Sequence, residues 1–389
     1  MLQSKIPCAE AMQTEIVTDP ARFREIEGAW QRLHQEAGGG IFVHHGYLRA
    51  WGESLGRGRR LRITLLWQGS RLMAALPMEH AGRARTWAVM GHGRSGLAQW
   101  LVHPSIGVPG VDPNADAALS RLLRLPLFSV LLLEPLESHD AEAAEHASRT
   151  AGLRARRKMT MRAARVDARG DFDSYLAECK PKTRSNFNRS ERKLAQAGAV
   201  ELRSDRDGSA ARLGFVEASC RSWKAATGTG LGVTDPGRRF LERLSENLGD
   251  RVCLFSVRRQ GDAVVAGRFT LVHDGVHHGM ANDFNEAFAT LGAGRNSMMH
   301  WVREAFEDPE VRALDLMRTN ALNADVATDT RELERVIVSR PFDPAILVFL
   351  GGQALRRLQK RATGWTKGRR GTRFGARAPD GHGPNGAAG

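Results

Sequence analysis

The chain reads LGAGRNS over residues 291–297 and MMHWVREAF over residues 298–306. Glycines let a backbone approach a ligand closely, and the second run predicts a helix. Free amides at a helix start face outward, and the helix dipole favours an anion there. We therefore predict an anion-binding turn that would accept a pyrophosphate, made of Gly292, Ala293, Gly294, Arg295, Asn296 and Ser297. The alternative is a plain strand-to-helix turn, since the GK[ST] of a P-loop is missing.

Strands are predicted on both sides of this turn. Residues 276–282 precede it, and residues 313–317 and 333–338 follow the helix. Strands that alternate with helices favour an α/β protein whose sheets are covered by helices.

The same order of elements occurs twice along the chain. Each copy consists of a helix, a glycine-rich break, a second helix and a β-hairpin with a glycine in its turn. We infer a duplicated unit, although chance is the alternative because this order is common. The ranges are 26–33, 47–55 and 61–78 in the first copy, and 215–223, 240–248 and 252–272 in the second. Residues 154–169 are interpreted as the connection between the copies.

Length and composition indicate a globular protein of two domains. The 389 residues exceed the usual size of one core, and 42% of them are hydrophobic. The most apolar stretch, 125–133, is too short to cross a bilayer, and the N-terminus does not read as a secretory signal. Four scattered cysteines without a CxxC pair argue against a zinc site and against a disulfide framework. We expect a cytoplasmic protein without a metal.

The net charge of +14 is concentrated at the C-terminus. Residues 351–389 contain nine basic residues and one acid, and they offer few large apolar side chains. We expect a largely disordered tail that either aids solubility or attaches the protein to an anionic surface. Because the charge of the other residues is modest, specific nucleic-acid binding is not expected.

A second basic segment reads KPKTRSNFNRSERKLAQAG over residues 180–198. Pro181 suits a first helical turn and Gly198 suits a helix end, while Phe187 and Leu194 form one apolar stripe. The segment predicts an amphipathic helix, whose charged face is either simply solvated or binds an acidic substrate.

This segment resembles the basic helix that opens the acyltransferase domain of CelD-like proteins, a branch of the GNAT superfamily related to FemABX peptidyltransferases. Further similarities follow in the family's order over roughly residues 14–350. They are Trp223-Lys224, the hairpin containing residues 261–267, residues 281–284, the glycine-rich helix entry, Leu314-Asp315-Leu316, and in the first half residues 41–52 and Leu76-Pro77-Met78.

The resemblance implies tandem GNAT-like domains with mixed sheets flanked by helices. Residues 14–165 would form the N-terminal domain and residues 166–350 the acyltransferase domain, between a flexible 1–13 and the tail 351–389. The cofactor would be acetyl-CoA or another acyl-CoA, with its pyrophosphate on residues 292–297 and its pantetheine between the strands 276–282 and 313–317. The acceptor would be an amine on a small molecule or glycan precursor, in polysaccharide or envelope biosynthesis.

Such a reaction needs a base for the acceptor amine. Asp283 and Asp315, at predicted strand ends, are candidates for the base or for orienting the acceptor, and His278 is a third candidate. The substrate-binding candidates are Lys182, Arg184, Trp223, Lys224, Arg318 and Asn320. The only tyrosines are Tyr47 and Tyr175, so either Tyr47 reaches the site from the first domain or solvent protonates the thiolate.

One departure from the family concerns the segment after Asp315, which lacks the usual Gly-acid-Tyr-Lys pattern. Two alternatives therefore stay open. One is a FemABX-like transferase that uses aminoacyl-tRNA, and the other is a noncatalytic GNAT-like partner in polysaccharide assembly, peripheral at the inner membrane face through its tail.

Overall fold

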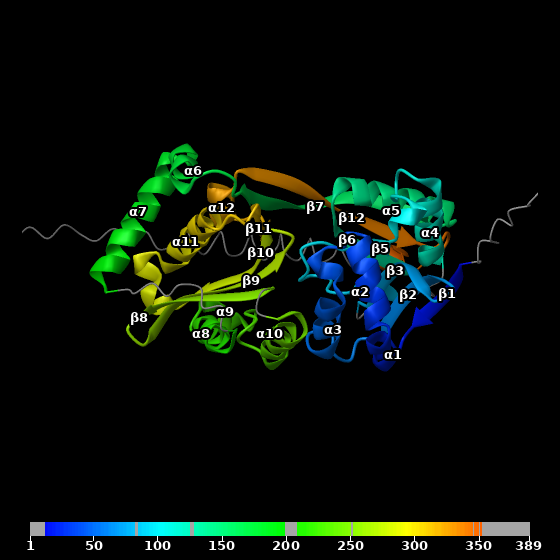
Figure 1. Cartoon of the computed structure of the whole chain (residues 1–389), viewed down its shortest axis with the longest axis horizontal. Helices are drawn as coiled ribbons and strands as arrows, with labels where there is room; N and C mark the ends of the chain where they lie inside the picture. The colour runs from blue at the N-terminus through cyan, green and yellow to red at the C-terminus, as the bar shows by residue number, and fades with distance from the viewer. Residues whose placement is uncertain are drawn as a thin grey trace, which may run out of the picture. The chain divides into compact units, whose positions relative to one another are not determined.

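The computed structural model describes residues 12–81, 85–124, 128–198, 208–249, 252–344, 346–349 and 351. The strands of these residues form one sheet in the order β1-β2-β3-β4-β6-β12-β7-β11-β10-β9-β8, with β5 paired to β3 (Figure 1). Helices cover both faces of this sheet. The protein is therefore an α/β protein with a mixed sheet flanked by helices, as the sequence predicts.

The first half contributes β1 (Gln13–Val17), α1 (Pro20–Glu25), α2 (Glu27–Glu36), η1 (Ile41–Val43), α3 (His45–Glu53), β2 (Leu61–Gln68), β3 (Arg71–His80), β4 (Thr86–Val89), β5 (Leu101–Val102), η2 (Pro104–Ile106), α4 (Pro113–Arg124), β6 (Val130–Leu136) and α5 (Ser138–Thr150). The second half contributes β7 (Arg154–Asp167), α6 (Phe172–Glu178), α7 (Pro181–Gln196), α8 (Gly208–Cys220), α9 (Trp223–Thr227), α10 (Asp235–Leu248), β8 (Cys253–Gln260), β9 (Ala263–His273), β10 (Val276–Phe284), η3 (Glu286–Leu291), α11 (Ala293–Glu307), β11 (Ala313–Arg318), α12 (Ala321–Val326) and β12 (Asp329–Ser339).

The two halves share a strand plan, which supports the duplication. Each half has a long antiparallel hairpin, β2–β3 or β8–β9, with Gly69 or Gly261 in the left-handed region at its turn. Each half also has one parallel pair, β4 with β6 and β10 with β11. The hairpins and the helix over Pro181–Gln196 confirm the sequence prediction, including a left-handed Gly198 after the helix.

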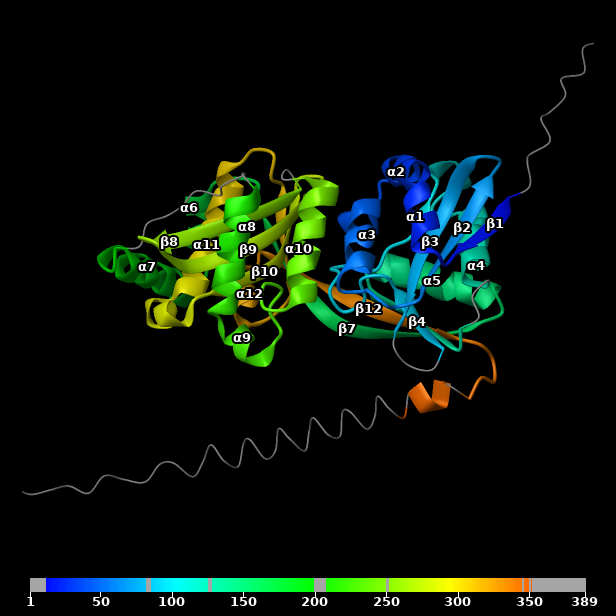
Figure 2. The same cartoon turned by 90° about the horizontal axis from the view of Figure 1, so that it is seen from below.

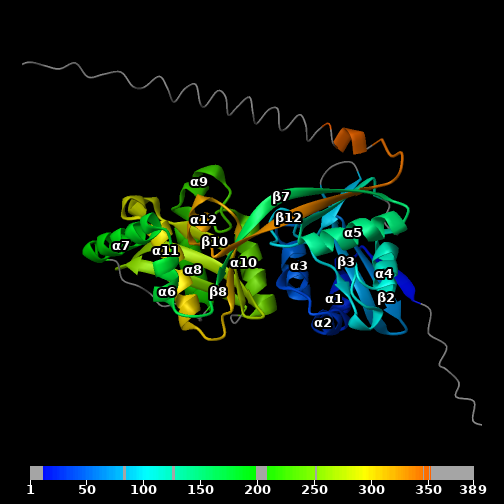
Figure 3. The same cartoon turned by 90° about the horizontal axis from the view of Figure 1, so that it is seen from above.

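The residues predicted as a connection, 154–169, are in fact mostly a strand. β7 pairs with β12 along its whole length (Figure 3), and it pairs with β11 at its C-terminal end. β12 in turn pairs with β6 from Glu334 to Ser339. This strand was not predicted, because both partners of β7 lie about 150 residues or more further along the chain.

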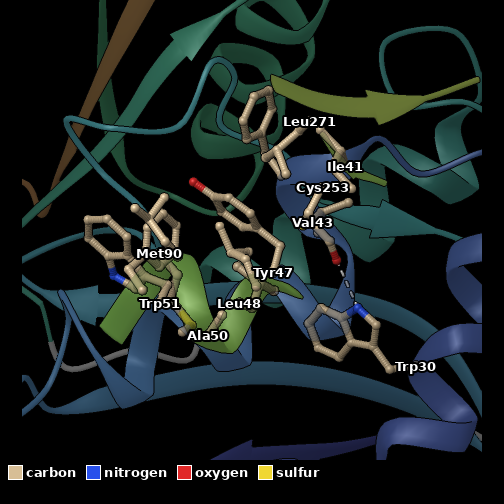
Figure 4. Packing of buried hydrophobic residues seen from close by; sticks show 14 of the residues in the cluster. Trp30, Ile41, Val43, Tyr47, Leu48, Ala50, Trp51, Met90, Cys253 and Leu271 are labelled. Atoms are coloured by element: carbon tan, nitrogen blue, oxygen red, sulfur yellow. Dashed lines mark hydrogen bonds between the residues drawn. The ribbon is translucent and has the colours of Figure 1, made fainter. Parts of the chain in front are cut away.

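One hydrophobic core joins helices of both halves on one face of the sheet. α1, α3, α8 and α10 lie on this face (Figure 2). Tyr47 and Trp51 of α3 pack edge-on against Phe240 of α10, with ring centroids 5.8 Å and 6.0 Å apart. Trp30 is fully buried beside them, and its indole N–H donates to the Val43 carbonyl at 2.9 Å (Figure 4). The halves are therefore held together by packed aromatic side chains.

Contacts divide the chain into a unit of Met1–Pro341 and a unit of Phe342–Gly389. The predictions for residues 1–11 and 352–389 lie outside the described residues, and the predicted domain limits stay a prediction. None of the described helices is long and apolar enough to span a membrane. The described residues also contain no cluster of His, Cys, Asp and Glu suited to a metal ion.

Candidate functional site

The parallel strands β10 and β11 separate in the middle of the sheet. They pair only from Val276 opposite Ala313 to His278 opposite Asp315, and both strands are irregular just beyond this point. β10 continues to Phe284, and residues 276–282 are all half-buried although the strand lies inside the sheet. Beyond His278, β10 therefore presents backbone groups that have no partner in β11.

A histidine, a carboxylate and an arginine meet where the strands separate. Nδ1 of His278 lies 3.4 Å from Oδ2 of Asp315. Arg331 of β12 donates to the same oxygen at 2.5 Å and also pairs with Glu137. The structure thus brings together two of the three predicted catalytic residues.

Asp315 is nearly inaccessible, yet it is kept ionised. Burial raises its pKa, but His278, Arg331 and the backbone N–H of Met317, which donates to Oδ1 at 2.8 Å, hold the pKa below its ordinary value. Met317 adopts a φ of 60°, which is costly for a residue with a Cβ. Backbone strain next to a buried carboxylate is typical of functional sites.

The first half covers this cluster. The ring of Phe42 lies edge-on to the ring of His278, with centroids 5.2 Å apart. Gly96 sits so close to Phe42 and Met317 that an added Cβ would lie 2.6 Å and 2.9 Å from their side chains. Residues of the first half therefore form one wall beside the separated strands.

Asp283, the third predicted catalytic residue, lies further along β10 and pairs with a different cation. Lys224 of α9 donates to its Oδ1, while Oδ2 is buried without a hydrogen-bond partner among the described residues. Lys224 was predicted to bind substrate, and Trp223 next to it is 52% exposed. Asp283 and Lys224 thus form a second polar pair beside an exposed aromatic ring.

The three candidate catalytic side chains occupy one face of the sheet. Asp315 lies between Leu314 and Leu316, which both pack toward α11, so its side chain points to the opposite face. Asp283 likewise alternates with neighbours that contact the start of α11. A ligand held at the start of α11 must therefore pass between β10 and β11 to reach these carboxylates.

The turn before α11 is shorter than predicted, because α11 begins at Ala293 and residues 293–297 already belong to the helix. Gly292 adopts a φ of 76°, and its carbonyl accepts the first helical hydrogen bond, from the amide of Asn296 at 3.0 Å. The amides of Ala293, Gly294 and Arg295 precede this bond and have no partner within the helix. Gly294 must be small, since a Cβ there would lie 2.7 Å from the Phe284 ring.

Asn296 and Ser297 are buried and are held by protein partners. Asn296 accepts from Arg258 and donates to Glu191. Ser297 donates to Oδ1 of Asn282 at 3.1 Å, and Asn282 donates to the Gly294 carbonyl at 3.2 Å. These two side chains shape the turn, and their predicted role as ligands of a phosphate stays a prediction.

A cavity of about 200 Å³ lies next to the turn. Arg189 and Lys193 of α7 line it together with Gly292 and Arg295. Lys193 donates to the Thr290 carbonyl at 3.0 Å, which holds its ammonium group near the turn. Its three cations, of which Arg295 also lies 3.6 Å from Asp325, make this cavity suitable for an anion.

Among the described residues, the other predicted substrate-binding residues form no hydrogen bond with His278 or Asp315. Lys182 is exposed on α7, and Arg184 donates to the carbonyls of Ala177 and Cys179. Asn320 caps α12 by accepting from two amides at 2.9 Å, and Arg318 is exposed at the end of β11.

Sequence reasoning missed three residues of the site. Arg331 gave no signal, because only the fold brings β12 beside Asp315. Arg189 and Lys193 belong to the predicted basic helix, but no motif indicated that they approach Gly292.

The hydroxyl of Tyr47 forms a hydrogen bond with the hydroxyl of Ser95 at 3.0 Å, and burial raises the pKa of Tyr47.

One protein family and several solved structures are similar to the chain. The family described as acetyltransferase (GNAT) domain matches residues 181–324. No curated protein shows significant sequence similarity to the chain. The C-terminal domain (DUF2156) of a protein named as a lysylphosphatidylglycerol synthetase from Agrobacterium fabrum is 13% identical, with 84% of this chain and 96% of that chain covered and a TM-score of 0.52.

Two further solved structures are similar to the chain. FemX is 10% identical, with 86% of this chain and 99% of that chain covered and a TM-score of 0.56. A tandem GNAT protein from the clavulanic acid biosynthesis pathway is 15% identical, with 85% and 100% covered and a TM-score of 0.45. At such identities the likeness concerns the fold alone. The family described as acetyltransferase (GNAT) domain, in contrast, is matched at the level of sequence, over residues 181–324.

Proposed function

We propose that this protein is an N-acyltransferase of the CelD-like type, which moves an acyl group from acetyl-CoA or another acyl-CoA to an amine. The acceptor would be a small molecule or glycan precursor of polysaccharide or envelope biosynthesis. In this proposal residues 166–350 form the catalytic domain and residues 14–165 cover the acceptor side. The location would be cytoplasmic, with the basic residues after Gly351 giving peripheral attachment to the inner membrane face.

The observation that carries the proposal is that β10 and β11 separate, and that a different polar site lies on each face of the sheet at this point. On one face of the sheet lie the free amides at the start of α11 and the cavity with three cations. On the other face lie His278 and Asp315. A donor with an anionic end and a reactive end suits this arrangement, because its two ends can lie on opposite faces.

The residues at the turn fit the anionic part of CoA. The amides of Ala293, Gly294 and Arg295 would bind the diphosphate oxygens, and the side chains of Lys193 and Arg295 would balance their charge. The unpaired edge of β10 beyond His278 offers backbone donors and acceptors to the amides of pantetheine.

The chemistry requires a base on the acceptor side. Acyl-CoA supplies the acyl carbon as a thioester; the transfer forms a C–N bond and breaks the C–S bond. His278 would take the proton that the amine loses, while Asp315 orients the imidazole and stabilises its charged form. Asp283 with Lys224 would position the acceptor. Since Tyr47 is engaged with Ser95, we assign the protonation of the thiolate to solvent.

The direct experiment is mass spectrometry of the purified protein for bound CoA thioesters, followed by thermal unfolding with added CoA. At a free CoA concentration of 100 times Kd, binding should raise the melting temperature by several degrees, because it adds about 2.7 kcal/mol to the free energy of unfolding. Lys193→Gln combined with Arg295→Gln should remove most of the shift. Arg192→Gln combined with Arg239→Gln is the control, since both residues are exposed cations outside the cavity. The absence of any shift with the wild type at millimolar CoA would refute the proposal.

An aminoacyl-tRNA-dependent transfer is the second candidate, and the exposed basic face of α7 favours it. Lys182, Arg189, Arg192 and Lys193 are all exposed on this helix. Transfer from charged tRNA without any response to CoA would support this function. A protein that binds CoA but transfers the acyl group to no acceptor would instead be a noncatalytic partner.

A further inference from the structure

A larger cavity lies between α11 and the strands β8 and β9. Its volume is about 650 Å³, which is a common size for a small-molecule site. Leu254, Ser256, Arg268 and Thr270 line it from the sheet, and α11 lines it from His300 onward. Since β9 lies between α8 and α11 (Figure 1), this cavity is on the α11 face of the sheet.

This cavity is separate from both parts of the proposed transfer site. Within the described residues, it shares no lining residue with the cavity at Gly292. His277 of β10 lines it, whereas the next side chain along the strand, His278, points to the opposite face of the sheet. The proposed function therefore gives this cavity no role.

Arg268 brings a buried positive charge to the cavity. The residue is 4% exposed, and burial lowers its pKa to about 10, so it stays charged at neutral pH. Nη2 donates to the carbonyl and to the hydroxyl of Ser297, and the guanidinium lies over the Trp301 ring, 5.0 Å from its centroid. Nε is buried and has no hydrogen-bond partner in the part of the chain that the structure describes.

The missing acceptor of Arg268 is costly for the fold. A buried N–H group without a partner costs about 1–3 kcal/mol, and more when the group is charged. Glu304 attracts Arg268 through space, but both hydrogen bonds of the guanidinium to described residues go to Ser297. A carboxylate of a ligand would supply an acceptor and balance the buried charge, because guanidinium and carboxylate groups form strong charge-assisted hydrogen bonds.

The end of α11 gives the cavity a negatively charged rim. Glu304, Glu307 and Asp308 all line the cavity, and Glu307 is exposed. The helix dipole adds a partial negative charge at this end, and the last turn of α11, which the structure describes in full, contains no basic residue. A positively charged group of a ligand is therefore stabilised at this rim.

Two further cations of the cavity are drawn toward α6 and α7. His300 pairs with Glu191 at 2.7 Å. The guanidinium of Arg303 lies 4.8 Å from the centroid of the Phe172 ring and 5.4 Å from that of the Phe187 ring. The cation on the sheet side of the cavity is therefore Arg268, while the three acids lie on the helix side.

We propose that this cavity binds a small zwitterion of the amino-acid class, with its carboxylate on Arg268 and its ammonium group beside Glu304 and Glu307. The apolar part of the ligand would contact Leu254 and Ala305, which also line the cavity. This site goes beyond the proposed acyl transfer and does not depend on it.

Other classes of ligand fit the cavity less well. A nucleotide or an oligophosphate carries several negative charges, which the carboxylates of the rim repel. A simple cation is repelled by Arg268, and an uncharged sugar leaves the buried guanidinium without a counter-charge. A zwitterion satisfies both ends of the cavity at once.

A ligand screen with the full chain tests the inference. Thermal unfolding is followed without CoA, in the presence of each common amino acid or of the dipeptide alanylalanine at millimolar concentration. A compound that binds the native state raises the melting temperature. The compound with the largest shift is then titrated by calorimetry beside two analogues: its amide, which lacks the carboxylate, and its deamino form, which lacks the ammonium group.

Two variants locate the binding site. Arg268→Met removes the charge but keeps an apolar side chain over Trp301. Ser256→Leu keeps Arg268 and fills the space beside it, because Ser256 lies directly opposite Arg268 in the register of β8 and β9. Ser245→Leu is the control, since Ser245 is a half-buried serine of α10, on the other face of the sheet.

We expect both variants to bind the compound at least about tenfold more weakly, and the control to bind it as the wild type does. Both analogues should also bind at least about tenfold more weakly than the amino acid or dipeptide itself. If Arg268→Met does not fold, Ser256→Leu and the analogues still decide the outcome.

The absence of any shift with all compounds would overturn the inference. An affinity that Ser256→Leu leaves unchanged, or that Ser245→Leu weakens equally, would overturn it as well. An analogue that binds as tightly as the parent compound would show that a simple anion or cation is sufficient, which contradicts the proposed class of ligand. None of these results bears on the acyltransferase proposal, because CoA is absent throughout.

Discussion

The pair of Asp315 and Arg331 allows a quantitative prediction. Asp315 is 3% exposed, and its Oδ2 accepts from Arg331 at 2.5 Å. Arg331→Met leaves this buried carboxylate without its main cation. Because the Arg331 side chain is 28% exposed, water compensates for part of the loss, and we expect a destabilisation of about 2–3 kcal/mol at pH 8.

The destabilisation should depend on pH. In the wild type the lowered pKa of Asp315 gives stability that is present above the unfolded pKa of about 3.9 and lost as the pH falls through the folded pKa. In the variant, burial dominates and raises the pKa of Asp315, so the carboxyl group becomes protonated at a higher pH than in the wild type. Once it is protonated, the cost of burying an unpaired charge disappears. The difference between the two proteins should therefore shrink as the pH falls from 8 to 4.

Urea unfolding followed by circular dichroism at several pH values measures this difference. Arg162→Met is the control, because it breaks the exposed pair with Glu332 and should cost at most about 1 kcal/mol at any of these pH values. Asp315→Asn in the Arg331→Met background should restore part of the stability, since it removes the unpaired charge. Equal costs for Arg331→Met and Arg162→Met, or a cost independent of pH, would refute the reasoning.

Three further predictions use features of the core and of the glycine turn. Gly292→Ala should destabilise the protein by about 1 kcal/mol more than Gly152→Ala. Both residues have a φ near 76°, but only at Gly292 would the added methyl group lie 3.1 Å from Ser190. Thermal unfolding of the two variants measures this difference. Glu191→Gln should make the protein less sensitive to acid. The partners of Glu191 outweigh the effect of its burial and lower its pKa to about 2, so this carboxylate contributes stability that is lost as the pH falls from the ordinary pKa of 4.5 toward 2. An unchanged acid unfolding curve of the variant would contradict this. Trp30→Phe should cost about 1–3 kcal/mol in urea, since the Val43 carbonyl loses its buried donor, and a change below 0.5 kcal/mol would show that water replaces it.

Local elements could be predicted from the sequence, while distant pairings could not. The hairpins and the helix from Pro181 follow from turn residues and caps that lie within a few positions of one another. β7 was not predicted, because its six basic residues among fourteen look solvated until β11 and β12 are placed beside it.

The candidate site shows the same limit. A predicted strand end led to Asp315, and His278 was a further candidate on another predicted strand; the fold brings the two into contact. The partners that decide their chemistry come from far away: Arg331 from the last strand, and Phe42 from the first half. The same holds for Asn296, whose partners Arg258 and Glu191 lie far from it in sequence.

The pairing of β12 with β6 has a consequence for biosynthesis. Val130 can pair with Thr86 of β4 early, but it can pair with Ser339 of β12 only after Ser339 has left the ribosome, more than two hundred residues later. Until then β6 is an unprotected sheet edge in the nascent chain, and such edges invite aggregation. Truncation before residue 329 should therefore yield an insoluble product even if every residue of the first half is present, and folding of the full chain should be slowed by this late closure.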